Sequence, residues 1–401
     1  MKKLALVLGS LLVIGSVASA KEVMPAPVAE PEVKIVEKPV EVIVYRDRVV
    51  EAPAKWRPNG SVDIQYRWYG ETENKVDGQL ATADGFDPKK EKDWARGTNN
   101  YGRLQLEGKV NITENQKIDF RYRNFHTVNT PKKHDEDKYN KSVAEKDAVR
   151  LRHFYNFGNV ADTKVNAISR LIWEQKAGDG AKKAEASVGF NFADYLFSND
   201  YIKTTNFTVR PLYAHKWTDH RGDKRNGSEV LGLYLESSYE LPYGFSVEFN
   251  VKPTYTFYGS KQNFTNHKDV ETFDSKRDLK EKKKAFDMDV ELYLYNTTNL
   301  YKNGKFAVDF NFEGGYDAYS FHQYRKVDIK KGEIRAKEIG AKREYSLYAL
   351  PTIEAGYQAT EFVKLYAAAG AEYRNWKEKN ENSAKNWRWQ PTAWAGMKVN
   401  F

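Results

Sequence analysis

Charged side chains recur at alternate positions in two separate parts of the chain, basic in the first part and acidic in the second. The basic set is Arg67, Arg103, Arg121, Arg123, Arg150 and Arg152. The acidic set is Asp287, Asp289, Glu291, Asp309 and Glu313. Side chains two positions apart share one face of an extended strand, so each set is expected to line one surface. Such surfaces select ions and polar solutes electrostatically, as rings of charged side chains do in pores.

Other kinds of chemistry find little support in the sequence. The lack of cysteine excludes disulfides, thiolate catalysis, cysteine-ligated metals and a lipoprotein anchor. The 7 histidines show no metal-ligand spacing, so we assign no metal and no cofactor. No nucleophile elbow frames a serine, and we expect no enzyme activity. Catalytic triads are recognised by geometry and not by sequence, however, so a surface hydrolase is kept as an alternative.

Strands are the elements that must position these charges. From residue 59 onward, apolar and polar residues alternate with a period of two, in segments of roughly ten residues. The fourteen segments are 62–68, 103–107, 118–123, 149–154, 165–173, 184–192, 207–217, 231–239, 245–257, 286–294, 306–313, 345–353, 363–373 and 387–401. Aromatic residues make up 14% of the chain, which suits aromatic girdles at two membrane interfaces.

The connections between the segments also alternate, in length. Short ones are predicted at 113–116, 157–161, 241–244 and 356–361, with slightly longer ones at 193–200 and 296–304. Long ones are predicted at 70–100, 129–146, 176–182, 218–227, 259–283, 320–341 and 375–386. Short periplasmic turns and long extracellular loops are typical of outer-membrane barrels. Residues 59–401 are therefore predicted to form an all-β, transmembrane antiparallel β-barrel of about fourteen strands.

The last fifteen residues carry the clearest alternation. One face holds Trp389, Pro391, Ala393, Ala395, Met397, Val399 and Phe401, and the other holds Arg388, Gln390, Thr392, Lys398 and Asn400. An apolar strand at a chain end invites aggregation unless it closes a sheet and faces lipid. This ending resembles the terminal strand of bacterial outer-membrane barrels, which implies that Phe401 is the C-terminal assembly signal.

The N-terminal residues predict export. Residues 1–20 have a basic start, an apolar stretch and a small-residue cleavage site, which predicts a signal peptide cleaved between Ala20 and Lys21. Residues 21–58 are rich in proline and are interpreted as a periplasmic tether, with a short paired strand or cell-wall docking as the alternative. Export argues against a nucleic-acid partner, although the formal net charge is +9.

A barrel of this size is too wide for side chains alone to fill, so we expect a water-filled lumen narrowed by an infolded loop. In a ring of fourteen strands, the third and fourth lie across from the tenth and eleventh. Arg121, Arg123, Arg150 and Arg152 on the third and fourth strands would then oppose the acidic set and create a field across the lumen. The alternative is that each charge is paired with a neighbour, as Asp119 beside Arg121 would allow, and that salt screens the rest over roughly 8 Å.

Four stretches resemble a known family. They are MKKLALVLGSLLV, KEVMPAP, EPEVKIVEKPVEVIVYRDRVVEAPAKWRPNGSVD and the closing AGMKVNF, and they are similar to the major outer-membrane porin of fusobacteria. The resemblance implies a homotrimeric general-diffusion porin, abundant at the cell surface and also linked to adhesion. Its implied partners are outer-membrane lipid and glycolipid, small hydrophilic solutes and ions, and host or bacterial surface ligands that contact the loops.

The favoured function is passive diffusion of ions and small hydrophilic solutes through an outer-membrane channel. The alternative is a surface adhesin whose barrel only anchors binding loops. Stepwise conductance in a lipid bilayer would separate the two, because an anchor with a plugged lumen would show none.

Overall fold

The computed structural model describes residues 56–73, 100–128, 147–177, 180–217, 227–265, 279–327, 343–344, 347–376 and 386–401. The predicted signal peptide, its cleavage site at Ala20 and Lys21, and most of the proline-rich segment lie outside the described residues. The described helices are two short 3-10 turns, η2 (Ala193–Tyr195) and η3 (Pro242–Gly244). Among these residues, no helix has the length and apolarity needed to cross a membrane.

The described chain is otherwise built from β-strands. The first eight are β1 (Asn59–Tyr69), β2 (Tyr101–Asn111), β3 (Gln116–Thr127), β4 (Ala148–Asn159), β5 (Asn166–Lys176), β6 (Lys182–Asn191), β7 (Lys203–Trp217) and β8 (Ser228–Glu240). The others are β9 (Phe245–Thr265), β10 (Leu279–Asn303), β11 (Phe306–His322), β12 (Arg325–Lys326), β13 (Arg343–Glu344), β14 (Leu347–Gln358), β15 (Val363–Trp376) and β16 (Asn386–Asn400).

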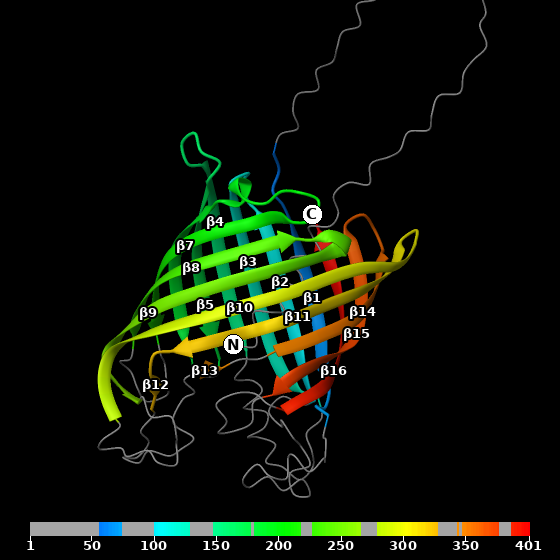
Figure 1. The fold of residues 1–401 in the computed structure, drawn as a ribbon. Helices are drawn as coiled ribbons and strands as arrows, with labels where there is room; N and C mark the ends of the chain where they lie inside the picture. The colour runs from blue at the N-terminus through cyan, green and yellow to red at the C-terminus, as the bar shows by residue number, and fades with distance from the viewer. Residues whose placement is uncertain are drawn as a thin grey trace, which may run out of the picture.

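Fourteen of these strands form a closed antiparallel barrel, as the alternation predicts, and β12 and β13 are two-residue additions to its rim (Figure 1). Each long strand pairs with its neighbours in the chain, and β1 pairs with β16 to close the ring. Gly60 and Phe401 seal this seam: the backbone N–H of each donates to the carbonyl of the other, at 2.9 and 3.0 Å. Because the ring is closed, each of these fourteen strands has a neighbouring strand on both sides.

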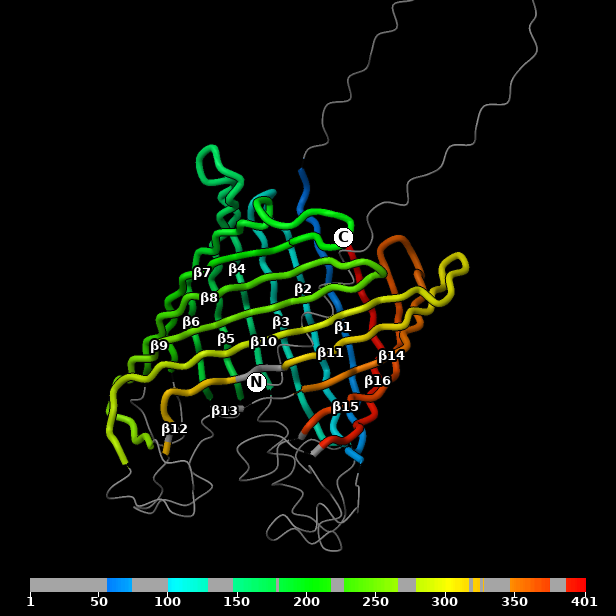
Figure 2. The backbone as a smooth tube through the Cα atoms, viewed as in Figure 1, coloured from blue at the N-terminus to red at the C-terminus, as the bar shows by residue number. Residues whose placement is uncertain are grey.

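The pairing of β9 with β10 continues beyond the predicted segments (Figure 2). Thr265 at the end of β9 lies opposite Leu279 at the start of β10, so only 266–278 separate the strands and the predicted connection at 259–283 is too long. Side chains such as Lys282 and Lys283 make both faces of this extension polar. A ladder with two polar faces has no alternation to detect, although its backbone pairing continues.

Strands also extend into two other predicted connections. The turn predicted at 296–304 is mostly strand, because β10 runs to Asn303 and β11 begins at Phe306. Only Gly304 and Lys305 form the turn, and Gly304 adopts a φ of 54° that glycine tolerates best. The connection predicted at 320–341 contains the end of β11 and the short β12.

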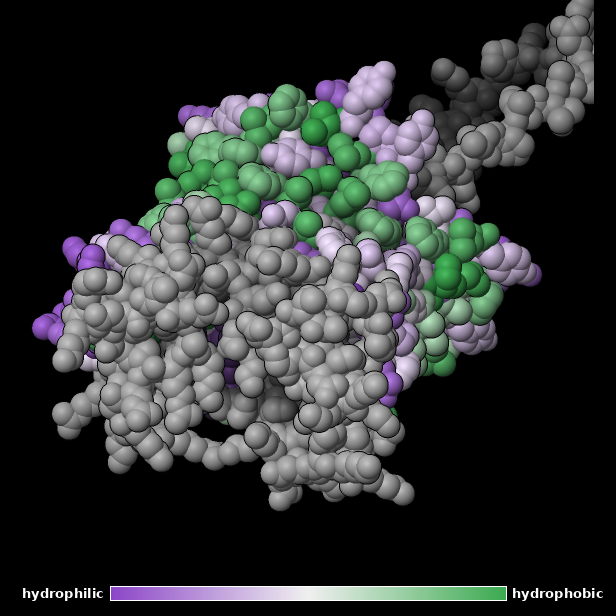
Figure 3. Space-filling model, turned by 60° about the horizontal axis from the view of Figure 1, so that its bottom comes forward, coloured by the Kyte–Doolittle hydropathy of each residue, from purple (hydrophilic) through white to green (hydrophobic). Residues whose placement is uncertain are grey.

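The barrel is apolar outside and polar inside. Leu171 and Leu233 point outward and are 53% and 52% exposed, whereas the inward Gln390 and Thr392 are 3% and 2% exposed. In Figure 3, hydrophobic side chains gather over part of the outer wall. A surface this apolar is unfavourable in water and favourable against hydrocarbon, so the arrangement is that of a transmembrane barrel. Phe401 also lies on the outer side, exposed to the surroundings.

Leu171 tests this assignment, because it lies in the middle of β5 and faces outward. In a lipid-embedded barrel, Leu171→Arg should destabilise folding by about 2–4 kcal/mol, since a guanidinium at the bilayer midplane loses its hydration. Guanidinium titration of the protein folded in phosphatidylcholine vesicles measures the change. The control Leu171→Ile should stay near the wild-type value. Equal stabilities for the Arg and Ile variants would contradict a lipid-facing outer wall.

Candidate functional site: the charged lumen

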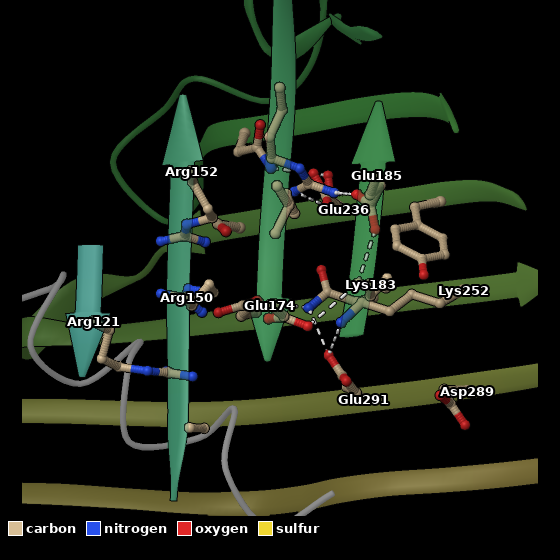
Figure 4. A pocket seen from close by; sticks show the side chains of 18 of the residues that line it. Arg121, Arg150, Arg152, Glu174, Lys183, Glu185, Glu236, Lys252, Asp289 and Glu291 are labelled. Atoms are coloured by element: carbon tan, nitrogen blue, oxygen red, sulfur yellow. Dashed lines mark hydrogen bonds and ion pairs between the residues drawn. The ribbon is translucent and has the colours of Figure 1, made fainter. Parts of the chain in front are cut away.

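A cavity of about 650 Å³ lies inside the barrel, lined by strands from β3 round to β10 (Figure 4). The predicted residues Arg121, Arg150 and Arg152 line it from β3 and β4, and Asp289 and Glu291 line it from β10. Both predicted charge sets therefore contribute to one cavity. Its wall between them, from β5 to β9, carries charges of both signs that the sequence analysis did not single out.

A network of ion pairs dominates that intervening wall. Arg170 donates to Glu185 at 2.9 Å and to Glu236 at 3.2 Å, and Glu236 also accepts from Arg210 Nε at 3.0 Å. Glu185 also accepts a hydrogen bond from the Lys183 ammonium group, at 3.1 Å. Removing charges from water is costly unless each is paired and hydrogen-bonded, and sharing the two carboxylates meets that condition.

Gly189 on β6 makes room for part of this network. A Cβ atom at this position would lie 2.6 Å from Nη2 of Arg210, so with a larger residue here the Arg210 side chain would have to shift. The Arg210 guanidinium therefore passes over β6 from β7 and approaches the backbone carbonyl of Ile168 on β5 at 3.5 Å. The absence of a side chain at residue 189 thus leaves room for the observed position of the Arg210 guanidinium.

Two further pairs extend the network around the cavity. Lys183 lies 3.4 Å from Glu174, and Lys252 donates to Glu291. Glu291 also accepts from the Asn250 amide at 3.2 Å. Of the predicted acidic set, Glu291 is therefore already neutralised by a neighbour.

The predicted basic residues fall into three groups by partner. Arg152 forms a bidentate ion pair with Asp119, with N–O distances of 2.6 and 2.7 Å. Arg67, Arg103 and Arg123 each donate to a neutral side chain, at 2.8, 2.8 and 2.7 Å. The third group is Arg121 and Arg150, for which the described residues provide no carboxylate within ion-pair distance.

Aromatic rings hold Arg67 and Arg103 against the wall near the long-connection end. The Arg67 guanidinium lies 4.7 Å from the ring centre of Tyr69 and 4.6 Å from that of Trp394. Tyr101 stacks on Tyr69 at 4.4 Å, and Arg103 lies 5.9 Å from the same ring. Cation–π contacts of this kind position a charge without neutralising it.

The rest of the predicted acidic set is hydrogen-bonded along β10 and β11. Asp287 contacts His322 at 2.7 Å, and Asp289 accepts from Ser320 at 2.6 Å. Glu313 accepts from the Tyr348 hydroxyl at 2.6 Å, and Asp309 accepts from Asn299 at 2.7 Å near the β10–β11 turn. Asp287, Asp309 and Glu313 of the acidic set do not line the cavity, and neither do Arg67, Arg103 and Arg123 of the basic set. Ser320, Tyr348 and Asn299 are neutral partners, so these contacts hold the carboxylates without an opposite charge.

Three carboxylates of the network, Glu174, Glu185 and Glu236, were not predicted from the sequence; they bind Arg170, Lys183 and Arg210. The signal was available, because Glu185 stands between Ala184 and Ala186 with the same period of two. Their partners depend on strand register and were not visible in any single segment. Among the described residues, no group of three or more His, Cys, Asp or Glu side chains is arranged to hold a metal ion.

Comparison with known proteins gives only distant similarities. No family model and no curated protein matches the chain. Three solved structures illustrate the matches. A bacterial polysaccharide outer membrane secretin is 11% identical, with a TM-score of 0.35, over 85% of this chain and 98% of that one. The outer membrane channel DcaP of Acinetobacter baumannii is 11% identical, with a TM-score of 0.31, over 86% and 96%. An anion-selective porin from Comamonas acidovorans is 10% identical, with a TM-score of 0.30, over 86% and 99%.

The first two are outer-membrane proteins by name, and the third is named as a porin. Similarities this weak carry no argument about function, so the barrel rests on its own strand pairing and burial. The fusobacterial family remains a prediction of the sequence.

Glu236 provides a test of the ion-pair network. Glu236→Gln leaves Arg170 and Arg210 without their shared carboxylate, and we expect a loss of about 3–5 kcal/mol in folding free energy. Glu240→Gln is the matched control, because its pair with Lys203 is more than half exposed and contributes at most about 1 kcal/mol. Unfolding in guanidinium measures both. Similar small losses for the two variants would show that the inner pairs are fully hydrated and contribute little.

Proposed function

We propose that this barrel is a channel of the bacterial outer membrane through which ions and small hydrophilic solutes diffuse passively. The observation that carries the proposal is the inverted distribution of polarity, with leucines outside and a charged cavity of about 650 Å³ within a closed ring. A closed wall satisfies its backbone in hydrocarbon, and a charged interior is compatible with water.

The orientation of the barrel in the outer membrane can be proposed from the position of its chain ends. The start of β1 and the end of β16 lie at the same end as the short β2–β3 turn, since Asn59 pairs with Asn111. In outer-membrane barrels the short-turn end faces the periplasm, which would place the predicted segment 21–58 there. Export by the predicted signal peptide, assembly read from Phe401, trimerisation and the fusobacterial family belong to the same proposal.

Ion selectivity is proposed to come from a field across the cavity. Arg121 and Arg150 lie on β3 and β4, whereas Asp289 lies on β10, and all three line the same cavity. The mixed pairs of β5 to β9 are largely self-neutralised, so the residual field would arise mainly from these ends. Charges in a confined lumen are screened less than charges on an open surface.

The adhesin alternative depends on loops. The connections that would bind a partner, such as 266–278, lie largely outside the described residues. Within the described residues, no observation favours adhesion over transport, and adhesion stays a prediction of the resemblance alone. A loop deletion that tests it should keep Thr265 and Leu279, since both belong to the β9–β10 ladder.

Reconstitution into planar lipid bilayers tests the channel. We expect stepwise conductance increases whose size rises with KCl concentration, because a wetted lumen carries bulk-like ions. Protein unfolded in guanidinium and diluted without refolding is the control and should give none. If folded barrels insert and no steps occur, the lumen is closed and the channel proposal fails.

Opposite substitutions test the field. In a KCl gradient, Arg150→Gln should shift the reversal potential toward cation preference, and Asp289→Asn should shift it toward anion preference, since each removes one lumen charge. The double variant should lie between them. Two unchanged reversal potentials would mean that local pairing and screening, and not a transverse field, govern ion passage.

A further inference from the structure

Arg121 and Arg150 form a like-charged pair in the wall of the cavity. They are direct register partners across β3 and β4, so their Cα atoms face each other in the ladder. Their side chains point inward and are only 6% and 5% exposed. In Figure 4 the Arg121 side chain extends from β3 toward β4, the strand that carries Arg150. Like charges directly opposite each other destabilise a sheet unless something lies between them.

Neighbouring cations of the same cavity are treated differently. Arg152, Arg170, Lys183 and Lys252 each have a carboxylate within ion-pair distance. Arg121 and Arg150 have no such partner among the described residues, and this distinguishes them from the other four. Nη1 of Arg121 and Nε of Arg150 also lack a hydrogen-bond partner there, as does Nε of Arg170. A buried N–H group without an acceptor is unfavourable, especially when it carries charge.

The carboxylates nearest to the pair in the ladder are engaged elsewhere. Glu107 is the register partner of Arg121 on β2, and it accepts from the Gln105 amide at 3.1 Å. Glu174 is the register partner of Arg150 on β5, and it is directed to Lys183 at 3.4 Å. Glu107 and Glu174 each lie on the strand next to the pair. The guanidinium groups of Arg121 and Arg150 line the cavity and keep N–H groups that no described acceptor binds.

We propose that Arg121 and Arg150 form a binding subsite for the oxyanion group of a passing solute, either a carboxylate or a phosphate. This proposal rests on the channel function above and assigns it a preferred class of solute. Guanidinium groups donate to carboxylate and phosphate oxygens in matched, charge-assisted pairs. A bound oxyanion would supply the missing acceptors and relieve the repulsion between the two arginines.

Single-channel recording with inorganic phosphate and with succinate tests the subsite. Added to a KCl solution, each probe should reduce the wild-type conductance saturably as it occupies the lumen. In the Arg121→Gln/Arg150→Gln variant the apparent affinity should fall by roughly tenfold or more, because charge-assisted hydrogen bonds are lost. The matched control is Asp119→Asn/Arg152→Gln, which removes a guanidinium from β4 together with its own carboxylate. It should retain the effect.

A second readout does not depend on conduction. Phosphate or succinate should raise the thermal unfolding midpoint of the wild-type barrel in detergent and leave that of the Arg121→Gln/Arg150→Gln variant unchanged. That variant should fold, since it loses a repulsive pair. Saturation by phosphate alone or by succinate alone identifies the oxyanion. Absence of both effects, or equal effects in wild type and variant, overturns the subsite, whereas a barrel that binds but does not conduct KCl overturns the channel.

Discussion

Backbone hydrogen bonding in a medium without water is the constraint on which this structure depends. Every peptide group of a strand in hydrocarbon needs a partner, and a sheet provides partners for all of them only if it closes on itself. Here the closing pair is β1 with β16, sealed at Gly60 and Phe401. Closure then dictates side-chain placement, because alternate residues can face only lipid or lumen. The exposed leucines and the buried arginines are two results of one geometry.

The closed geometry explains why charged side chains face the lumen, but it does not by itself determine which of them form ion pairs. Strand pairing sets which inward residues are neighbours, and the ladder brings Arg170, Glu185 and Glu236 together from β5, β6 and β8. Cations such as Arg170 and Lys183 thereby meet a carboxylate, which limits the free-energy cost of keeping them away from bulk water. The same ladder places Arg121 opposite Arg150, where neither meets one. The strand register therefore decides which inward charges form ion pairs within the wall and which remain free to bind a solute.

The fold was largely predictable from the sequence, and the site was predictable only in part. Alternation such as that around Phe310 and Asp309 identifies a strand and its two faces, since it records lipid on one side and water on the other. That record ends where both faces are wet, which is why the extension of β9 to Thr265 was missed. Contacts such as Arg210 with Glu236 depend on the offset between two strands, and no single segment contains that offset.

The seam between β1 and β16 also governs how such a chain can fold. Its partners lie at opposite ends of the described sequence, so the contact order is high and the ring can close only after the last strand has arrived. Until then, β1 presents an unpaired edge that any other strand could join. We therefore expect the unfolded polypeptide to depend on chaperones until it reaches the membrane, and a chain that lacks β16 to aggregate.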